Sequence, residues 1–177
     1  MIGRFQPFHL GHLELVHQIL NENDEIIIIV GSSQANYTSK NPFTAGERIW
    51  MIRDTLIESK IDMSRVFLIN VTDDVNNSRW FSNIKSVSPP FKVLYTGNKF
   101  VKILLKNETV LIKEPKLFQE NTLKGSEIRK LILEDSSKWQ ELVSESVRKI
   151  FREIDAVERI RNIYQTWTDS PFSEPNK

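Results

Sequence analysis

The sequence contains no cysteine among its 177 residues. This absence excludes disulfide bonds, thiolate-held zinc sites and a cysteine nucleophile, and it fits a reducing compartment. Long apolar runs are also missing, because the longest, Ile26 to Val30, has the length of a strand and not of a membrane span. The first residues lack the charged and apolar segments of a signal peptide. We therefore expect a cytoplasmic protein that does not associate with a membrane.

An excess of charge of one sign is missing as well, because 24 basic and 23 acidic residues leave a formal net charge of +1. The protein therefore has no global basic field, and we expect no nucleic-acid partner, although a local basic site stays open. The length and the 40% hydrophobic content suit one globular domain. We expect a single domain over residues 1–167, helical from about residue 126, and a disordered tail over residues 168–177.

Strand-like and helix-like segments alternate along most of the chain. The run Ile26–Val30 is apolar on both faces, which suits the buried centre of a parallel sheet. Further strands are expected at residues 66–69, 93–95 and 109–112, and helices at residues 12–20, 44–57, 80–86 and 98–105. Thr44 and Glu47 have the spacing of a capping box at the start of the second helix. Only Met1 and Ile2 precede Gly3, so the first strand is either very short or begins upstream of this numbering.

This alternation predicts an α/β fold with a central parallel sheet flanked by helices, followed by C-terminal helices from Ser126 onward. Polar loops follow several of the expected strands, at residues 3–12, 31–42, 72–78 and 96–98. Because the carboxyl ends of parallel strands meet at one edge of a sheet, ligands bind there in such folds. We therefore expect these loops to form one shared site.

His9 and His12 are three residues apart at the expected start of the first helix, so both face the same side. A helix start offers unpaired amides and the positive end of the helix dipole, which together suit phosphate oxygens. Gly11 would let a phosphate approach the backbone closely. The alternatives are two surface histidines or a metal-binding pair, but the neighbouring Arg4 favours phosphate binding.

The segment Gly3-Arg4-Phe5-Gln6-Pro7-Phe8-His9-Leu10-Gly11-His12 resembles the signature of the archaeal-type nicotinamide mononucleotide (NMN) adenylyltransferases, which belong to the HxGH nucleotidyltransferase superfamily. Four further blocks resemble motifs of that family in the same order, at residues 41–48, 88–91, 95–98 and 125–129. The resemblance extends to about Arg161. It implies a Rossmann-like nucleotidyltransferase fold and a homo-oligomer, in the form of a hexamer.

The resemblance also implies a reaction in which ATP and NMN give NAD and pyrophosphate. Mg²⁺ is expected to accompany ATP, no metal-ligating side chain is assigned, and no tightly bound organic cofactor is expected. The attacking phosphate is already ionised near neutral pH, so the reaction needs no general base and no covalent nucleophile. Catalysis then consists of in-line positioning and neutralisation of charge on the triphosphate, which are tasks for hydrogen-bond donors and cations.

The site residues follow from matching the motifs position by position. The catalytic residues expected are Arg4, His9, His12 and Arg129. The residues expected to bind ATP are Gly3, Phe5, Gly11, Lys40, Gly97, Asn98, Gly125 and Ser126. The residues expected to bind NMN are Gly31, Ser32, Asp73, Asn77 and Trp80. In this arrangement an aromatic face would stack on the pyridinium ring, and an amide would hydrogen-bond the carboxamide.

Ser126 is expected to cap a helix. Arg129, three residues after Ser126, is expected to reach the β- and γ-phosphates of ATP. Asp73 and Asp74 are both candidates for the NMN contact, because the family pattern is shifted here. Lys40 is equally consistent with a ligand contact and with a solvated loop charge. Arg48 is expected to form a structural ion pair.

Two alternative readings stay open on the residues alone. A related transferase could use another acceptor, such as FMN or a phosphorylated alcohol, or could use CTP in place of ATP. A nucleotide-binding regulator without turnover is the non-enzyme alternative, although it would be expected to lack some of the four catalytic residues. No GxGxxG follows a strand and no GxxxxGK[ST] is present, so a Rossmann dehydrogenase and a P-loop NTPase are not supported.

Overall fold

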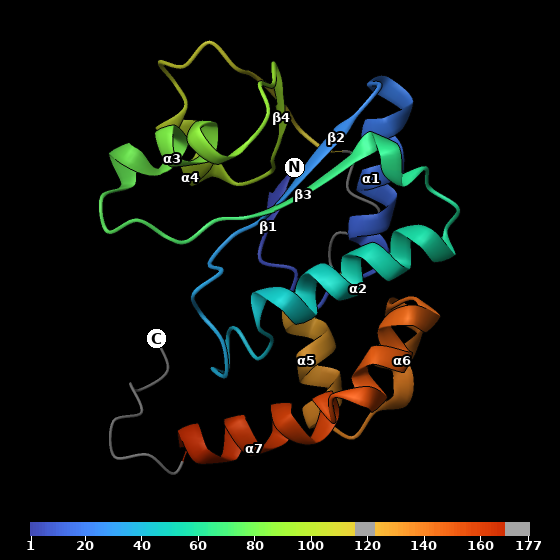
Figure 1. The fold of residues 1–177 in the computed structure, drawn as a ribbon. Helices are drawn as coiled ribbons and strands as arrows, with labels where there is room; N and C mark the ends of the chain where they lie inside the picture. Colours follow the sequence, from blue (N-terminus) through green and yellow to red (C-terminus); the bar gives the residue numbers. More distant parts are fainter. Residues whose placement is uncertain (116–122, 169–177) are drawn as a thin grey trace.

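The computed structural model describes residues 1–115 and 123–168, in which helices alternate with parallel strands (Figure 1). The strands are β1 (Ile2–Gly3), β2 (Ile26–Val30), β3 (Val66–Asn70), β4 (Val93–Tyr95) and β5 (Leu111–Lys113). The helices are α1 (Leu10–Glu22), α2 (Ala45–Glu58), α3 (Trp80–Val87), α4 (Lys99–Leu104), α5 (Gly125–Leu133), α6 (Glu145–Glu153) and α7 (Ala156–Thr168). These elements lie within a few residues of the bounds predicted from the sequence, and the tail expected to be disordered falls, from residue 169 on, outside the described residues.

The strands form two parallel sheets instead of the single central sheet expected from the sequence. The first has the order β1-β2-β3, with Ile2 opposite Ile29 and Gly3 opposite Val30. The second consists of β4 and β5. The physical reason is the length of β1, because two residues form a short ladder with β2 and none with β4 among the described residues. The predicted α/β class, the parallel pairing and the flanking helices are confirmed.

Side-chain contacts join the second sheet to the end of α1. The Tyr95 hydroxyl donates to Glu22 Oε2 at 2.8 Å, and the amide of Asn23 donates to the Tyr95 oxygen at 3.1 Å. Lys113 on β5 bonds the same Glu22 oxygen at 2.8 Å. The hydrogen bond from Lys113, together with those from Tyr95 and Gln18, lowers the pKa of Glu22 to about 2. This polar cluster ties the second sheet to the first half of the molecule.

The main core lies where β2, α1, α2 and the C-terminal helices meet. Alternate residues of β2 face it, namely Ile26, Ile28 and Val30, whereas Ile29 faces the other side and packs near Ile84 of α3. Both faces of β2 are therefore buried, as its run of β-branched residues predicts. Apolar residues of α5, α6 and α7 belong to the same core, so the C-terminal helices share their packing with the first sheet.

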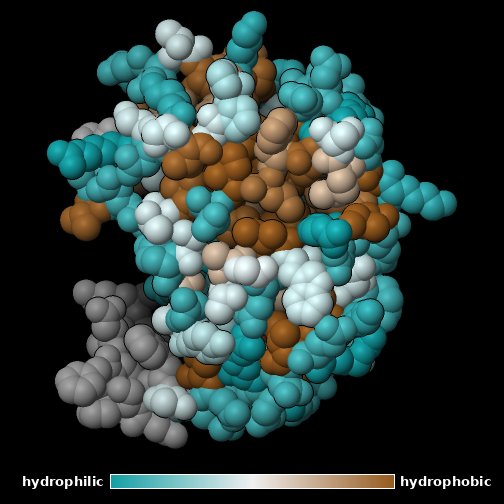
Figure 2. Space-filling model, in the orientation of Figure 1, coloured by the Kyte–Doolittle hydropathy of each residue, from teal (hydrophilic) through white to brown (hydrophobic). Residues whose placement is uncertain are grey.

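Apolar side chains gather on the face of the molecule that carries β2 and β3 (Figure 2). Phe67 of β3 is one of the large apolar side chains that stay exposed, at 36%. No helix among the described residues combines the length and the apolar composition needed to span a bilayer.

The start of α2 forms the capping box that the sequence predicts. The Thr44 hydroxyl accepts from the amide of Glu47 at 3.2 Å, and the Glu47 carboxylate accepts from the amide of Thr44 at 2.9 Å. Arg159 of α7 donates to both oxygens of Glu47 at 2.8 Å, and both of these side chains are largely buried. The cap of α2 thus also anchors the last helix.

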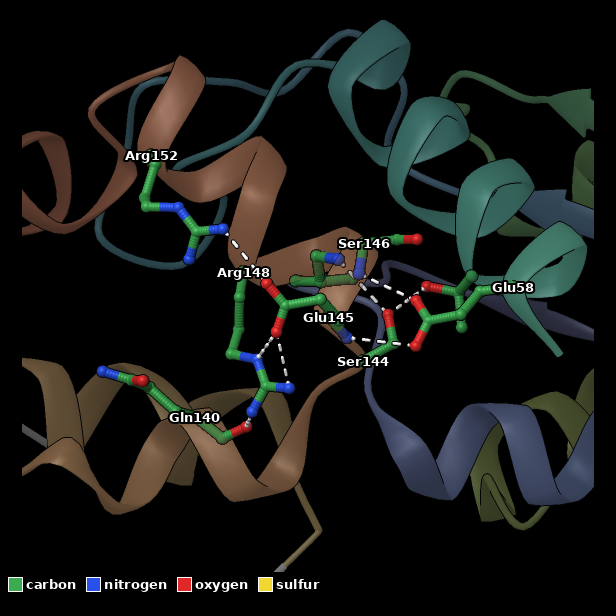
Figure 3. A network of polar contacts seen from close by, with 9 residues as sticks. Glu58, Gln140, Ser144, Glu145, Ser146, Arg148 and Arg152 are labelled. Atoms are coloured by element: carbon green, nitrogen blue, oxygen red, sulfur yellow. Dashed lines mark hydrogen bonds and ion pairs between the residues drawn. The ribbon is translucent and has the colours of Figure 1, made fainter.

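A polar network connects the end of α2 with the start of α6 (Figure 3). Ser144 caps α6 by accepting from the amide of Val147, and its hydroxyl lies 2.7 Å from the hydroxyl of Thr55. Glu58 accepts from the amide of Ser146 at 2.8 Å and from that of Glu145 at 3.3 Å. Burial alone would raise the pKa of Glu58, but the hydrogen bonds from Ser146 and Glu145 outweigh it and lower that pKa.

We expect Glu58→Gln to lower the free energy of unfolding by about 0.5–1 kcal/mol at neutral pH, because a carboxylate at a helix start is favoured by the helix dipole. The pKa of Glu58 is lowered in the folded protein, so its contribution is present above the ordinary value of 4.5 and disappears as the pH falls below it. Urea unfolding at neutral pH and near pH 3 measures both effects.

Glu153→Gln is the matched control, because Glu153 pairs only loosely with Lys149 at 3.9 Å on the exposed side of α6. It should change stability by a few tenths of a kcal/mol at most. Equal losses in the two variants at neutral pH would contradict the capping role of Glu58.

Candidate active site

Two histidines stand at the start of α1. His9 occupies the position before the helix in an extended conformation, and His12 is three residues on. Their rings stack with centroids 3.6 Å apart and an interplanar angle of 25°. A side chain on Gly11 would lie 3.3 Å from the ring of His9, so glycine leaves the space that this ring needs. The two rings therefore share one side of the helix start, as the spacing predicts.

Both imidazoles are neutral in the free protein at neutral pH. Burial lowers the pKa of His9 to about 4. Burial, together with the neighbouring His9, lowers the pKa of His12 well below its ordinary value. The backbone amide of His9 donates to His12 Nδ1 at 3.3 Å, which places the proton of His12 on Nε2. His12 can therefore offer an N–H donor without carrying a charge.

Arg129 of α5 reaches the loop that follows β1. Its guanidinium donates to the backbone oxygen of Gln6 at 2.6 Å. Burial, followed by the nearby charge of Arg4, lowers the pKa of Arg129. A side chain on Gly125 would lie 2.7 Å from the oxygen of Gln6, so only glycine permits this approach of α5. Arg129 is thereby held against the loop that carries Arg4 and leads to the two histidines.

The predicted cap of α5 is wrong. The residue that precedes the helix is Lys124, whereas Ser126 is the second residue of the helix and is exposed. The cap lies two residues earlier than expected, and Gly125 opens the helix in close approach to Gln6. Ser126 therefore contributes one of the unpaired amides of the helix start, and its hydroxyl is not needed as a cap.

A crevice of about 340 Å³ lies at the carboxyl ends of the strands. It brings together all five residues assigned to NMN with one assigned to catalysis and two assigned to ATP: Gly31, Ser32, Asp73, Asn77 and Trp80, with Arg4, and with Gly3 and Asn98. Trp80 is half-buried in its wall. Asn98 uses its side-chain oxygen to cap α4, by accepting from the amide of Phe100 at 2.9 Å. The predicted convergence of the strand-end loops is confirmed.

Both candidate aspartates line this crevice, but they have different hydrogen-bond partners. The Asp73 carboxylate accepts from the hydroxyl of Ser32 at 3.1 Å and from the amide of Gln34 at 3.2 Å. Asp74 instead accepts from the backbone amide of Asn76 at 2.8 Å and from Asn83 at 2.7 Å. Asp74 thus organises its own loop, and Asp73 lies against the end of β2. Gln34 was not singled out from the sequence, because its partner is 39 residues away.

Other predicted residues lie outside this crevice. Phe5 is buried among Phe8 and His12, so it can meet a ligand only through its backbone. Lys40 is exposed in the loop before α2, and Gly97 is exposed after β4. A second hollow of about 260 Å³ is lined by Ser126, Arg129 and residues of the loop before α2 and of α7. A larger hollow, of about 510 Å³, lies near the amino ends of β2 and β4 and has a mostly apolar lining, away from these groups.

Arg48 differs from its prediction. It is fully buried on α2 and forms no salt bridge among the described residues, where an ion pair was expected. Its guanidinium donates to backbone carbonyls, including those of Arg4 at 2.9 Å and Gly31 at 2.8 Å. The nearest acidic residue on its helix, Glu47, is already engaged by Arg159. Arg48 thus has the structural role that was predicted, but its partners are backbone carbonyls and not a carboxylate.

A family model of cytidylyltransferase-like proteins matches residues 1–131 of the chain. The nicotinamide-nucleotide adenylyltransferase of Caldivirga maquilingensis is 48% identical over 162 residues, which cover 92% of this chain and 91% of the relative. The enzyme of the same name from Pyrobaculum aerophilum is 48% identical over 159 residues, 90% of this chain and 89% of the relative. The chain belongs to the nicotinamide-nucleotide adenylyltransferase family.

Solved structures show the fold of this family. The bifunctional NMN adenylyltransferase/ADP ribose pyrophosphatase of Francisella tularensis superposes with a TM-score of 0.74 at 22% identity. The match covers 99% of this chain and 57% of that protein, so this chain spans somewhat more than half of that longer protein. A second structure of the same bifunctional enzyme, with a TM-score of 0.71, contains AMP and a manganese ion. The predicted nucleotidyltransferase fold is thereby confirmed.

The described residues of this family member contain no cluster of three or more histidine, aspartate or glutamate side chains that could hold a metal ion. Asp73, which faces the crevice, is already held by Ser32 and Gln34.

Acid should destabilise the protein through His9. The pKa of His9 is about 4 in the folded protein and ordinarily 6.5, so between these values only the unfolded chain binds the proton. The stability that comes from the neutral ring is complete above pH 6.5 and falls as the pH drops toward 4. At about 1.4 kcal/mol per pKa unit, the loss by pH 4 is on the order of 3 kcal/mol. Denaturant unfolding of the wild type and of His9→Asn at about pH 7.5 and about pH 4 measures it.

The quantity to compare is the difference between the two proteins, because other groups titrate in both. The variant lacks the titrating ring and should lose less stability on acidification. Equal losses in the wild type and His9→Asn would show that His9 does not exclude its proton.

Proposed function

We propose that this chain transfers the adenylyl group of ATP to NMN, giving NAD and pyrophosphate. The observation that carries the proposal is the crevice at the strand ends, where Trp80, Asp73, Ser32 and Arg4 line one hollow. An aromatic ring, a carboxylate and a cation suit the pyridinium, the amide and the phosphate of one mononucleotide. The names of the curated relatives support the same activity.

For NMN, the half-buried indole of Trp80 supplies a face on which the cationic ring can stack. Asp73, held in place by Ser32 and Gln34, can accept from the N–H groups of the carboxamide. Asn77 lies at the same rim, and the exposed Arg4 is placed to attract the phosphate. Gly31 and Ser32 complete this site at the end of β2, where the backbone can approach the ribose.

For ATP, the neutral rings of His9 and His12 supply N–H donors toward the α-phosphate at the start of α1, and Gly11 keeps this helix start accessible. The β- and γ-phosphates are assigned to Arg129 and to the amides of Gly125 and Ser126 at the start of α5.

The remaining ATP contacts are assigned through the backbone and the loops. Gly3 and Phe5 follow β1, Gly97 and Asn98 follow β4, and Lys40 lies in the loop before α2. The two helix starts and these strand ends together suit a nucleotide triphosphate beside the mononucleotide site.

In the reaction, an oxygen of the NMN phosphate attacks the α-phosphorus of ATP in line with the bond to the bridging oxygen. The new P–O–P linkage forms as the bond between the α-phosphorus and the α–β bridging oxygen breaks, and pyrophosphate leaves with the bonding electrons. No proton needs to move, because the attacking phosphate is already ionised. The residues of this chain therefore act by positioning the phosphates and by stabilising the charge that develops on them.

We propose Mg²⁺ as the metal, coordinated by the phosphate oxygens of ATP and not by a protein cage. The structure of a relative with AMP and a manganese ion supports the use of a divalent metal in this fold. We also propose that the chain forms a single domain over residues 1–167, assembles as a homo-oligomer and is located in the cytoplasm.

Incubation of the protein with ATP, Mg²⁺ and NMN should give equimolar NAD and pyrophosphate. FMN as acceptor and CTP as donor are the comparison arms, the second because the matching family model is named for cytidylyltransferases. The assignment would be refuted by product with FMN or CTP and none with ATP and NMN. Binding of both nucleotides without product would favour the regulator.

We expect His12→Ala to fold and to lose about 10²–10³ in turnover, the usual range for the loss of one donor to a transition-state oxygen. His17→Ala on the same helix is the control, because His17 lies more than one turn beyond the helix start to which the α-phosphate is assigned. Steady-state rates and circular dichroism of both variants test this. Turnover near that of the wild type in His12→Ala would remove His12 from the phosphate site.

A further inference from the structure

Arg48 is the largest fully buried side chain in the described residues, and all of its hydrogen bonds run to backbone carbonyls. Its Nη1 donates to the oxygens of Arg4 at 2.9 Å and Gly31 at 2.8 Å, and its Nη2 donates to that of Ser32 at 3.1 Å. Its Nε donates to Thr44 at 3.1 Å, one turn earlier on its own helix. One planar guanidinium thus joins the start of α2 to the ends of β1 and β2.

The carbonyls that Arg48 binds belong to the walls of the crevice. Arg4, Gly31 and Ser32 all line it, whereas Arg48 does not. Ser32 has a φ of 49° and Phe5, just after Arg4, has a φ of 51°, which is the left-handed region that side chains disfavour. Each such residue costs on the order of 1 kcal/mol or more and persists only where its surroundings hold it. The guanidinium supplies that restraint at both strand ends.

The choice of partners also leaves the charge of Arg48 uncompensated by a close carboxylate. Buried cations are usually paired, because taking a charge out of water is costly. Burial lowers the pKa of Arg48, and so does the charge of Arg4, whereas the carboxylates of Asp73 and Glu47 raise it. Two arginines, Arg4 on the crevice wall and Arg48 behind it, thus stand at the same strand ends as the carboxylate of Asp73.

We propose that Arg48 is a positioning residue for the mononucleotide. It sets the spacing of Arg4 and the Gly31–Ser32 turn through their backbone oxygens, without contacting the substrate. The proposal rests on the proposed function, and it adds a residue that governs NMN affinity from behind the crevice wall.

A second arginine provides a natural comparison at the opposite end of the first sheet. Arg65 donates to the backbone oxygens of Leu20 at 2.9 Å, Asn23 at 2.9 Å and Asp24 at 2.6 Å. It therefore clamps the end of α1 to the start of β3 by the same chemistry. None of its partners lines the crevice. Substitution of Arg65 therefore measures the contribution of such an arginine to stability, without an effect on the crevice.

The experiment compares Arg48→Lys and Arg48→Met with Arg65→Lys and Arg65→Met. Lysine keeps the charge but cannot reproduce the planar fork, and methionine keeps most of the apolar stem. We expect the KM for NMN to rise about tenfold or more in Arg48→Met and by less in Arg48→Lys, because small displacements of binding groups are costly. The KM for ATP should stay within about threefold. The Arg65 variants should lose stability with both KM values unchanged.

Hydrogen exchange gives a readout that does not depend on turnover. The amide of Gly31 donates to Gly3, and that of Ser33 donates to Val71, so both report on the strand ends. We expect these amides to exchange at least tenfold faster in both Arg48 variants than in the Arg65 variants. If Arg48→Met does not fold, Arg48→Lys carries the comparison.

The outcomes separate the two proposals. If the wild type makes no NAD but the strand-end amides exchange faster in the Arg48 variants, the proposed function is refuted. The role of Arg48 in holding the backbone of the strand ends is then retained. An active wild type whose Arg48 variants show an unchanged KM for NMN and unchanged exchange overturns the inference. Equal rises in the KM for NMN in the Arg48 and Arg65 variants would reduce Arg48 to a general contribution to stability.

Discussion

The site depends on the hydrogen bonds of Gln6. Its side-chain amide donates to the oxygen of Phe43 and accepts from the amide of the same residue, both at 3.0 Å, and its backbone oxygen accepts from Arg129. These contacts join the loop after β1 to the segment before α2 and to the start of α5, which lie 37 and 123 residues away. Because Gln6 is nearly completely buried, an unmet amide there would cost on the order of 1–3 kcal/mol. The loop with the two histidines is therefore held from two sides.

The state of the histidines follows from that packing. The aromatic rings of Phe5 and Phe8 lie against His12, and His9 is 6% exposed, so protonation of either ring is disfavoured. Positive charge at the site comes instead from arginines, which stay protonated even when partly buried. Neutral donors and permanent cations are thus divided between residue types, and the arrangement suits a reaction that moves phosphate without moving a proton.

Much of this could be predicted from the sequence because the signals are local. The β-branched run of β2, the capping box of Thr44 and Glu47, and the histidine spacing on α1 each lie within a few residues. The two-sheet arrangement, the pairing of Gln34 with Asp73, and the partners of Arg48 could not be predicted in the same way. They depend on contacts between segments that are 16 to 44 residues apart, and backbone carbonyls leave no mark on the residue types. The helix start at Gly125 was misplaced for the same reason, since the approach to Gln6 decides it.

The division into two sheets has a thermodynamic consequence. One wall of the crevice, with Arg4 and Ser32, belongs to the first sheet, and the other, with Thr96 and Asn98, follows the second. Tyr95, Glu22 and Lys113 hold the second sheet to α1 by side-chain contacts, without a shared ladder. A ligand that touches both walls therefore acts as a cross-link between the sheets. By linkage, its binding energy stabilises their apposition, and whatever strengthens that apposition tightens the ligand by an equal amount.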